Sequence, residues 1–374
     1  MDWNFKTLCE EAALDITNPD EPFLGFRRSN DNDPDKYFGG VSYVWGNGRR
    51  IPILKIMQTN ICQFNCNYCA NRKDSNIRRA IISPESLAHT FYLMYKAHMV
   101  EGIFLTSGIC NNADWTMDIM LQTIRLIRVR YNFKGYIHLK IIPGASEEAV
   151  RQATLYASRV SINFESSREE TLKIIAPDKS IYRDDLPVLD VIKKHVSAGN
   201  NRIIQGGITT QFVVGASEET DSNLIKATEW LYRKYDLKRA YFSGFSPIIG
   251  TPLENRIPTS IKRTYRLYQA DALIRFYDFK WDDIIFENNG NLSESLDPKT
   301  LYAQKHPELF PVEINTAPVE LLIKVPGIGR KSADKIIEVR KEHKLYDLNQ
   351  LKKMGIRTKN AMDRAGRRRS IVFF

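Results

Sequence analysis

Three cysteines within eight residues are the strongest chemical feature of the sequence. The segment CQFNCNYC spaces Cys62, Cys66 and Cys69 as C-x3-C-x2-C. Three thiolates with this spacing can ligate three irons of a 4Fe–4S cube and leave the fourth iron without a protein ligand. An open coordination position suits a metal that binds a substrate, whereas a structural zinc site would need a fourth Cys or His nearby. The nearest histidine, His89, lies twenty residues further on, inside a predicted helix.

This motif lies on the loop after the first predicted strand, with the aromatic Tyr68 before the last cysteine, and it resembles the radical S-adenosylmethionine (SAM) superfamily. The resemblance implies two cofactors, a 4Fe–4S cluster and SAM, and an electron donor such as flavodoxin or ferredoxin. In that superfamily the open iron binds the amino and carboxylate groups of SAM. One-electron reduction then cleaves SAM to a 5′-deoxyadenosyl radical, which abstracts hydrogen from the substrate.

Residues that match the SAM-contacting segments of the superfamily follow in chain order. Thr106-Ser107-Gly108, at the end of the second predicted strand, stands where the superfamily has a Gly-Gly-Glu-like segment whose backbone contacts the SAM amino group. This chain lacks the usual acidic residue there, so the resemblance implies that Thr106 or Ser107 substitutes for it. Together with Tyr68, these three residues are the first candidate cofactor contacts.

Two further segments complete the predicted SAM site. Asn163 and Glu165, at the end of the fourth predicted strand, resemble the ribose-contacting pair of the superfamily, and residues two apart in a strand point to the same face. The alternative is that Glu165 only caps the following helix. Gly215, in the segment VVGASEE, resembles the part of the fifth strand that supports adenine.

Other reactive or charged residues lie near these motifs. Cys110 follows Gly108 closely and is a candidate catalytic hydrogen donor, although most lone cysteines are simply small buried groups. Three basic residues could reach an anionic substrate or the SAM carboxylate, and the alternative for each is a surface charge: Lys140, Lys179 and Arg183. The total of five cysteines is odd, which argues against a disulfide framework.

Strand-like and helix-like segments alternate from residue 51 to about residue 245. The expected strands are 51–59, 102–107, 136–142, 159–165, 207–215 and 239–245, and the expected helices are 84–100, 114–131, 146–156, 184–198, 220–235 and 259–278. Such alternation predicts parallel βαβ units. The predicted fold class is therefore α/β, a partial (β/α)6 TIM-like barrel, with a doubly wound open sheet as the alternative.

Four parts are expected along the chain: an N-terminal extension (1–50), the barrel (51–286), a polar linker (287–312) and a small all-α domain (313–374). Charge distinguishes the last part from the rest. Residues 315–374 hold 15 Lys and Arg against 6 Asp and Glu, whereas the other 314 residues hold 39 against 38. This asymmetry favours a C-terminal module that binds a polyanion such as nucleic acid, with a solvated basic tail as the alternative.

A glycine-rich turn, Pro326-Gly327-Ile328-Gly329, separates two helix-like segments in this basic part. Its glycines permit unusual φ angles and a close backbone approach to a partner. The second helix begins just after the turn, so its free N–H groups and positive dipole end can face a phosphate. The pattern resembles the helix–hairpin–helix DNA-binding motif, which implies DNA contacts at Gly327, Gly329, Arg330, Lys331 and Lys335. A helical hairpin used for protein contacts is the alternative.

Two basic segments follow this turn. Residues 351–361 resemble a shorter second copy of the motif but lack its second glycine, so they could be only a packing partner. The run Arg367-Arg368-Arg369 would add salt-dependent contacts to phosphates.

The two halves together resemble a family of radical SAM proteins described as acting in DNA modification or repair. The residues that carry the resemblance are GVSYVWGNGRRIPILKIMQTNIC (40–62), YIHLKIIPGA (136–145), IIAPDKS (174–180) and HPELFPVEIN (306–315). Relatives occur in phage DNA hypermodification, where radical rearrangement of an amino-acid-decorated thymine is a proposed reaction. The resemblance implies an enzyme that modifies or rearranges a DNA base, which must leave the helical stack to react.

Three other functions stay open. The first is repair of a DNA lesion. The second is RNA modification, whose members usually need an extra cluster or cysteine pair, and only Cys9 and Cys110 are left here. The third is a non-enzymatic DNA-binding Fe–S protein, against which the three-ligand spacing argues.

Composition indicates a globular protein, since 43% of the residues are hydrophobic. No stretch reaches the roughly 18 apolar residues of a membrane span. The first residues, MDWNFKTLCEEAALD, do not resemble a secretory signal. We therefore expect a cytoplasmic protein without a membrane partner.

Overall fold

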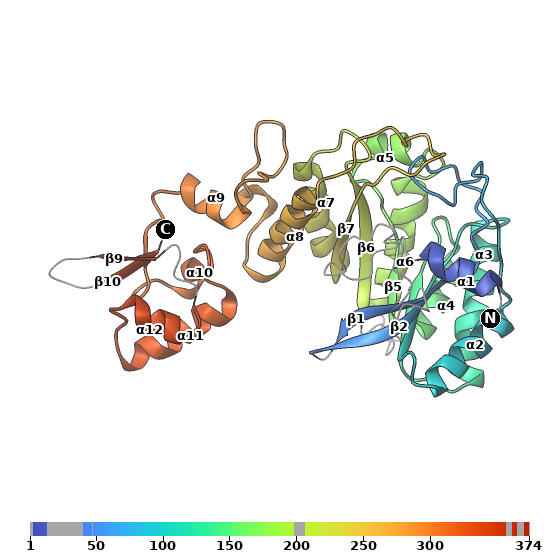
Figure 1. The fold of residues 1–374 in the computed structure, drawn as a ribbon, viewed down its shortest axis with the longest axis horizontal. Coiled ribbons are helices and arrows are strands. Elements are labelled where there is room, and N and C mark those ends of the chain that lie inside the picture. Colours follow the sequence, from blue (N-terminus) through green and yellow to red (C-terminus); the bar gives the residue numbers. More distant parts are fainter. Residues whose placement is uncertain are drawn as a thin grey trace, which may run out of the picture. The chain divides into compact units, whose positions relative to one another are not determined.

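The computed structural model describes residues 3–12, 40–46, 48–197, 206–356, 361–364 and 370–373 (Figure 1). The chain forms two compact units. The first comprises Met1–Glu219 and Trp230–Thr259, and the second comprises Thr220–Glu229 and Ser260–Phe374. The segment 287–312, predicted as a linker, belongs to the second unit.

A seven-stranded sheet forms the centre of the first unit, and its strands are ordered as in the chain. They are β1 (Val41–Gly46), β2 (Arg49–Met57), β3 (Gly102–Thr106), β4 (Tyr136–Lys140), β5 (Arg159–Ser161), β6 (Gly207–Val214) and β7 (Arg239–Gly244). Each pair from β2 to β7 is parallel. The sheet curls, with helices around it (Figure 1). A doubly wound sheet would reverse its strand order, so the partial (β/α)6 barrel is confirmed.

Side chains on the two faces of the sheet differ in polarity. Leu54 pairs with Ile103, which pairs with Ile137, and all three side chains are completely buried. The neighbouring row, on the other face, runs through Lys55, Phe104, His138 and Arg159. Because alternate residues of a strand point to opposite faces, one face packs against helices and the other lines the barrel with polar groups.

Helices follow the parallel strands as predicted. They are α2 (Pro84–Lys96), α3 (Ala113–Arg125) with a π-helical end η2 (Leu126–Arg130), α4 (Glu147–Tyr156), α5 (Glu169–Ile175), η3 (Ile181–Asp185), α6 (Leu186–Ser197) and α7 (Asp221–Tyr235). Four of them start at a polar residue whose side chain accepts a backbone N–H of the first turn: Ser83, Asn112, Ser146 and Ser180. Such caps satisfy donors that the helix leaves free, and they fix where each helix begins.

Two features of the first unit were not predicted. β1 pairs antiparallel with β2, and α1 (Trp3–Ala12) buries Phe5, Leu8 and Cys9.

The predicted strand 159–165 is shorter in the structure, where β5 ends at Ser161. Glu165 has a φ of 61° and joins β6 through a single bridge to Phe212. A positive φ takes a residue out of the extended conformation, so the strand cannot continue to Glu165.

The second unit contains a long helix, a series of short helices and a small sheet. The elements are α8 (Ile261–Phe276), η4 (Trp281–Asp283), α9 (Pro298–Lys305), β8 (Val312–Glu313), α10 (Val319–Leu322), α11 (Arg330–Glu342), α12 (Leu348–Lys353), β9 (Ala361–Arg364) and β10 (Ser370–Phe373). An apolar seam along the hairpin is completely buried: Leu322, Val325, Ile328, Ala333 and Ile336. The sheet β8-β10-β9 adds strands to a domain expected to be all-α. No helix in the described residues is long and apolar enough to cross a membrane.

Candidate active site

The cysteine loop leaves the barrel directly after β2 and is anchored at its base by Asn60. This side chain is completely buried. Its Nδ2 donates to the carbonyl of Arg78 at 2.9 Å, and its Oδ1 accepts the backbone N–H of Ala80 at 2.7 Å. The two ends of the loop are therefore clamped together by one amide side chain.

Arg79 holds the inside of the same loop. Its guanidinium donates to five backbone carbonyls, those of Asn60, Asn71, Arg72, Lys73 and Ser75. A guanidinium has five N–H donors in a rigid plane, so Arg79 can fix the path of a loop that has no regular secondary structure. Sequence reasoning missed Arg79, because a lone arginine carries no signal of this role.

Position 108 requires a glycine because its backbone lies close to the cysteine loop. A Cβ at this position would clash with the carbonyl oxygen of Ile61 and lie 3.2 Å from the Cβ of Cys62. The N–H of Gly108 donates to the carbonyl of Thr59 at 2.7 Å, and Gln63 N–H donates to Ile109 at 2.8 Å. The segment after β3 thus lies against the first cysteine, as a shared cofactor site requires.

The loop after α5 supports the other side of the cysteine loop. Asn65 N–H donates to Asp178 Oδ2 at 2.6 Å, and Asn67 N–H donates to the carbonyl of Ile175 at 2.7 Å. Neither Asp178 nor Ile175 was singled out from the sequence. These bonds connect the cysteines to a segment more than a hundred residues later in the chain.

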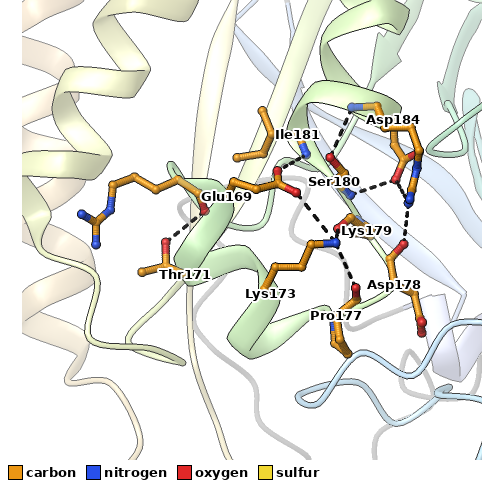
Figure 2. Close-up of polar contacts among 11 residues, drawn as sticks. Glu169, Thr171, Lys173, Pro177, Asp178, Lys179, Ser180, Ile181 and Asp184 are labelled. Carbon is orange, nitrogen blue, oxygen red and sulfur yellow. Dashed lines mark hydrogen bonds and ion pairs between the residues drawn. The ribbon is translucent and has the colours of Figure 1, made fainter.

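That supporting loop is itself braced by several polar contacts (Figure 2). Lys173 Nζ donates to the carbonyls of Pro177 at 3.1 Å and Lys179 at 2.6 Å. Asp184 Oδ2 accepts the N–H of Ser180 at 2.8 Å. With its carbonyls and N–H groups satisfied in this way, the loop can hold the side chains of Asp178 and Lys179 in place.

Glu165 and Lys179 form a buried ion pair at the end of the barrel. Lys179 Nζ lies 2.9 Å from Glu165 Oε1 and 3.3 Å from the carbonyl of Asn163. Burial opposes the charge on Lys179, but the carboxylates of Glu165 and Asp185 outweigh this effect and raise its pKa. Lys179, one of the three basic residues singled out from the sequence, thus binds the Glu165 carboxylate and the backbone carbonyl of Asn163.

Tyr68 belongs to the same group of residues. Burial, followed by the neighbouring Glu165 carboxylate, raises the pKa of the Tyr68 hydroxyl, so it stays protonated. A protonated hydroxyl can donate a hydrogen bond toward this carboxylate. This places the residue before the last cysteine beside the predicted ribose-contacting pair.

The three cysteines carry free thiols. Cys66 is buried, whereas Cys62 and Cys69 are partly exposed. Burial raises the pKa of Cys66, and it raises the pKa of Cys69 to about 12. In the described residues no three His, Cys, Asp or Glu side chains converge on one metal ion. A 4Fe–4S cube does not require such convergence, because each sulfur binds a different iron.

Buried polar atoms without partners show where a further group fits. Several buried side-chain atoms of the described residues have no hydrogen-bond partner, and they include Glu165 Oε2 and both carboxylate oxygens of Asp185. Burial raises the pKa of Asp185 well above its usual value. Leaving such atoms unsatisfied costs about 1–3 kcal/mol each. SAM carries an ammonium group, a sulfonium and ribose hydroxyls, which match these acceptors. The three cysteine thiols therefore fit a 4Fe–4S cluster, and the buried carboxylate oxygens fit SAM beside Glu165.

The other candidate residues surround this centre. Thr106 is buried, and Ser107 Oγ donates to the carbonyl of Thr59 at 3.4 Å. Gly215 has a φ of 83° just after β6. The N–H of Cys110 donates to Thr116 Oγ1 at 2.9 Å. Burial and, to a lesser degree, Cys62 raise the pKa of Cys110, which keeps it a thiol close to the cysteine loop.

The other two basic residues singled out from the sequence lie in different surroundings. Lys140 is close enough to Cys69 for its charge to oppose the rise in the pKa of that thiol. Arg183 instead pairs with Asp184 at 2.7 Å, and its side chain is 64% exposed. Arg183 therefore braces the supporting loop from the outside and does not point into the barrel.

The hairpin of the second unit has the predicted geometry. Gly327 has a φ of 88°, a conformation that favours glycine. Gly329 is the N-cap residue of α11, so the free N–H groups of this helix start at the turn. Lys335 Nζ donates to the carbonyl of Met354 at 2.9 Å, which ties α11 to the end of α12. The predicted contacts of Arg367-Arg368-Arg369 lie outside the described residues.

Comparison with known proteins agrees with both parts of this description. Residues 56–231 match the model of the radical SAM superfamily, and residues 310–362 match the helix-hairpin-helix motif. The chain therefore carries a radical SAM domain, a domain of enzymes that use a 4Fe–4S cluster and SAM. Its C-terminal part carries a helix–hairpin–helix motif, a type of motif that binds nucleic acid.

Individual relatives are distant. Biotin synthase from Leptospira biflexa serovar Patoc (strain Patoc 1 / Ames) is 23% identical over 276 residues, 72% of each chain. The crystal structure of methylornithine synthase (PylB) aligns with a TM-score of 0.47 and 14% identity over 59% of this chain and 60% of that one. HydG, a maturase of the [FeFe]-hydrogenase, aligns with a TM-score of 0.46 and 13% identity over 58% of this chain and 48% of that one. The alignments thus span about half to three fifths of these two solved chains.

Proposed function

We propose that this radical SAM enzyme acts on DNA and modifies or rearranges a nucleobase. The observation that carries the proposal is the presence, in one chain, of a radical SAM domain and a helix–hairpin–helix motif. Contacts of such a motif go to backbone phosphates, which give affinity with little sequence information. In this proposal the second unit holds DNA through Gly327, Gly329, Arg330, Lys331 and Lys335, and the first unit carries out the reaction.

Within the first unit, we assign the cluster to Cys62, Cys66 and Cys69. SAM is assigned to Glu165 and its neighbours, a set that consists of Tyr68, Thr106, Ser107, Gly108, Asn163 and Gly215. When bound, the two cofactors supply hydrogen-atom abstraction chemistry, with the electron coming from a donor such as flavodoxin or ferredoxin. Lys179 holds the Glu165 carboxylate in position, and Cys110 is the candidate hydrogen donor.

The polar face of the sheet supports a polar substrate. Lys55, His138 and Arg159 belong to one register row, in which Phe104 lies between Lys55 and His138. Burial, followed by the positive charges of Arg159, Lys140 and Lys55, lowers the pKa of His138 well below its usual value. The interior thus holds a neutral imidazole among cations, which suits a substrate with polar edges and negative charge, such as a nucleotide.

The small number of cysteines favours a DNA reaction over RNA thiolation or methylthiolation. Outside the C-x3-C-x2-C motif the sequence holds only Cys9 and Cys110. Two cysteines are too few for a second motif of three thiolates. An isomerisation, such as that of an amino-acid-modified thymine, moves atoms within the substrate and needs no sulfur donor, so it agrees with a single cysteine motif.

Nucleoside mass spectrometry tests the proposal. DNA and RNA would be isolated from cells that express the natural chain or its Cys66→Ala variant, and both would be digested to nucleosides. We expect a DNA nucleoside whose amount depends on the natural chain. A difference confined to RNA nucleosides would overturn the DNA assignment, and a difference seen only after DNA damage would replace modification by repair.

A further inference from the structure

A cavity of about 550 Å³, largely open to solvent, lies within the second unit between the end of α8 and the hairpin. One wall is Arg275–Asp278, and the other is Gly329–Lys331. Its volume falls within the roughly 300–1,000 Å³ typical of pockets for small organic ligands. The hairpin is therefore faced by residues 275–278, which lie outside the helix–hairpin–helix motif.

The hairpin wall is suited to a phosphate. α11 is 13 residues long and begins at Arg330, and its N-cap residue Gly329 has no side chain to occupy the first N–H groups. The positive end of the helix dipole and the side chains of Arg330 and Lys331 add to the attraction of an anion. Helix starts of this kind are common, so this wall alone would not identify a ligand.

The α8 wall supplies the second element of recognition, an exposed aromatic ring. Phe276 is 53% exposed although it is a large apolar residue. The guanidinium of Arg275 lies 4.5 Å from the centre of its ring and is held by the buried carboxylate of Asp271. Aromatic rings and guanidinium planes are the groups on which unpaired bases stack.

Contacts of Tyr277 and Lys299 with the hairpin turn keep the two walls together. The Tyr277 hydroxyl lies 3.4 Å from the position of a Cβ on Gly329. Lys299 Nζ donates to the carbonyl of Ile328 at 2.5 Å and lies 4.6 Å from the centre of the Tyr277 ring. The end of α8 and the hairpin turn are thus fixed to each other by side chains.

We propose that this cavity binds one unpaired nucleotide of a DNA strand, with its phosphate at the start of α11 and its base on Phe276. The proposal rests on the proposed function, in which the second unit holds DNA, and it adds the form of the DNA. In an intact duplex both faces of each base are covered by neighbouring pairs, so only a single strand, an end or a flipped-out nucleotide can enter. This agrees with chemistry that needs a base outside the stack.

A substitution at Asp278 is expected to strengthen nucleotide binding and so provides a second test of the proposal. The Asp278 carboxylate lies 3.9 Å from Arg330, and both side chains are largely exposed, at 80% and 56%. The carboxylate therefore competes with a phosphate for the same guanidinium. Asp278 has a φ of 57°, which Asn tolerates well. Asp278→Asn should accordingly strengthen binding about two- to fivefold without disturbing the backbone.

The experiment compares a single-stranded oligonucleotide with a duplex of the same sequence, using the full-length reconstituted protein and fluorescence anisotropy. Phe276→Ala should weaken single-strand binding about tenfold and duplex binding less than twofold, as expected for loss of one stacked base. Phe276→Trp should retain binding. Tyr265→Ala is the matched control, because Tyr265 is a 59% exposed aromatic on the same helix but not part of the cavity.

The outcomes separate the two proposals. Equal losses for Phe276→Ala and Tyr265→Ala, or equal losses on both DNA forms, would overturn the nucleotide cavity while leaving DNA binding in place. Failure of the natural chain to bind either form would overturn the proposed function itself. Displacement of the oligonucleotide by dAMP at similar concentration would show a site for free nucleotides instead of a strand. Photocrosslinking of 5-iodouracil in the single strand to residue 276 should confirm the stacked base.

Discussion

The carboxylate of Asp178 accepts the backbone N–H of Asn65 at 2.6 Å and so joins the loop after α5 to the centre of the cysteine motif. Asn65 lies between Cys62 and Cys66, and Asp178 is next to Lys179, which pairs with Glu165. One short segment thus contacts both the predicted cluster ligands and the predicted SAM site.

Asp178→Ala should loosen the cysteine loop without removing a ligand. The lost bond involves a charged acceptor, but Asp178 is exposed, so we expect a cost of about 1 kcal/mol. Release of iron to a chelator should become about fivefold faster. Asp178→Asn is the control, since its amide oxygen can still accept the N–H. Equal release rates for the natural chain and Asp178→Ala would show that the bond does not support the cluster.

Replacing Cys62, Cys66 or Cys69 by Ala should reduce the iron content of the reconstituted protein from about four per chain to near zero and abolish SAM cleavage. Cys9→Ala and Cys110→Ala are the matched controls and should keep the iron. If Cys110→Ala also keeps SAM cleavage but loses product formation, the hydrogen-donor assignment is supported. A complete cluster in Cys66→Ala would refute the ligand assignment.

Lys179→Met should destabilise the first unit by about 3–5 kcal/mol, because it leaves the Glu165 carboxylate buried without its partner. The double variant Lys179→Met with Glu165→Gln removes both charges and should recover much of this loss in a denaturant titration. Glu165→Gln and the double variant should both bind SAM more weakly than the natural chain in calorimetry. Both should keep its iron content. Unchanged SAM affinity in Glu165→Gln would remove this residue from the SAM site.

Gly327→Ala should cost about 1–2 kcal/mol of stability, since the residue has a φ of 88°. It should also weaken duplex binding and flatten its salt dependence, because the hairpin can no longer approach a phosphate closely. Gly355→Ala is the matched control. Its φ is 75°, and among the described residues a Cβ there meets nothing within 4 Å. Similar DNA affinity in both variants would argue against the hairpin as the DNA anchor.

Lys299 should make the second unit more stable as pH rises above neutrality. Burial, opposed by Asp297, lowers the pKa of Lys299 from 10.5 to about 7. Between these values the unfolded chain binds a proton that the folded chain lacks, so the free energy of unfolding increases with pH. Below about pH 7 both states are protonated and this contribution is constant. Denaturant titrations between about pH 6 and pH 9 should show the rise in the natural chain but not in Lys299→Met.

The barrel could be predicted from the sequence because its signals are local. Segments such as GIFLT (102–106) and YIHLK (136–140) have strand composition, and the parallel order follows from the helices between them. The cysteine spacing likewise depends on eight neighbouring residues. Gly108 and Glu165 could be located because they follow or end predicted strands, and the structure places Gly108 against the cysteine loop and Glu165 beside Tyr68.

Features that depend on distant contacts could not be predicted. Asp178 accepts a backbone N–H that lies 113 residues earlier in the chain, and Arg79 binds carbonyls spread over the loop 60–75. Neither residue carries a sequence pattern for that role. β5 ends at Ser161, and Glu165, with a φ of 61°, joins β6 through an isolated bridge to Phe212. In the second unit, α9 and α8 pack with the hairpin through Lys299 and Tyr277. A cut near residue 312 would therefore separate the hairpin from its supports, and point variants such as Gly327→Ala are the cleaner test.

The bond between Asn65 and Asp178 spans 113 residues of sequence, and this separation has a consequence for maturation. During synthesis the N-terminal part of a chain emerges first, so the three cysteines leave the ribosome long before Asp178 exists. Until then the cysteine loop lacks one of its two supporting sides. Iron delivered to the nascent chain would meet an incomplete site, and stable cluster loading should begin only after the loop following α5 has emerged and folded.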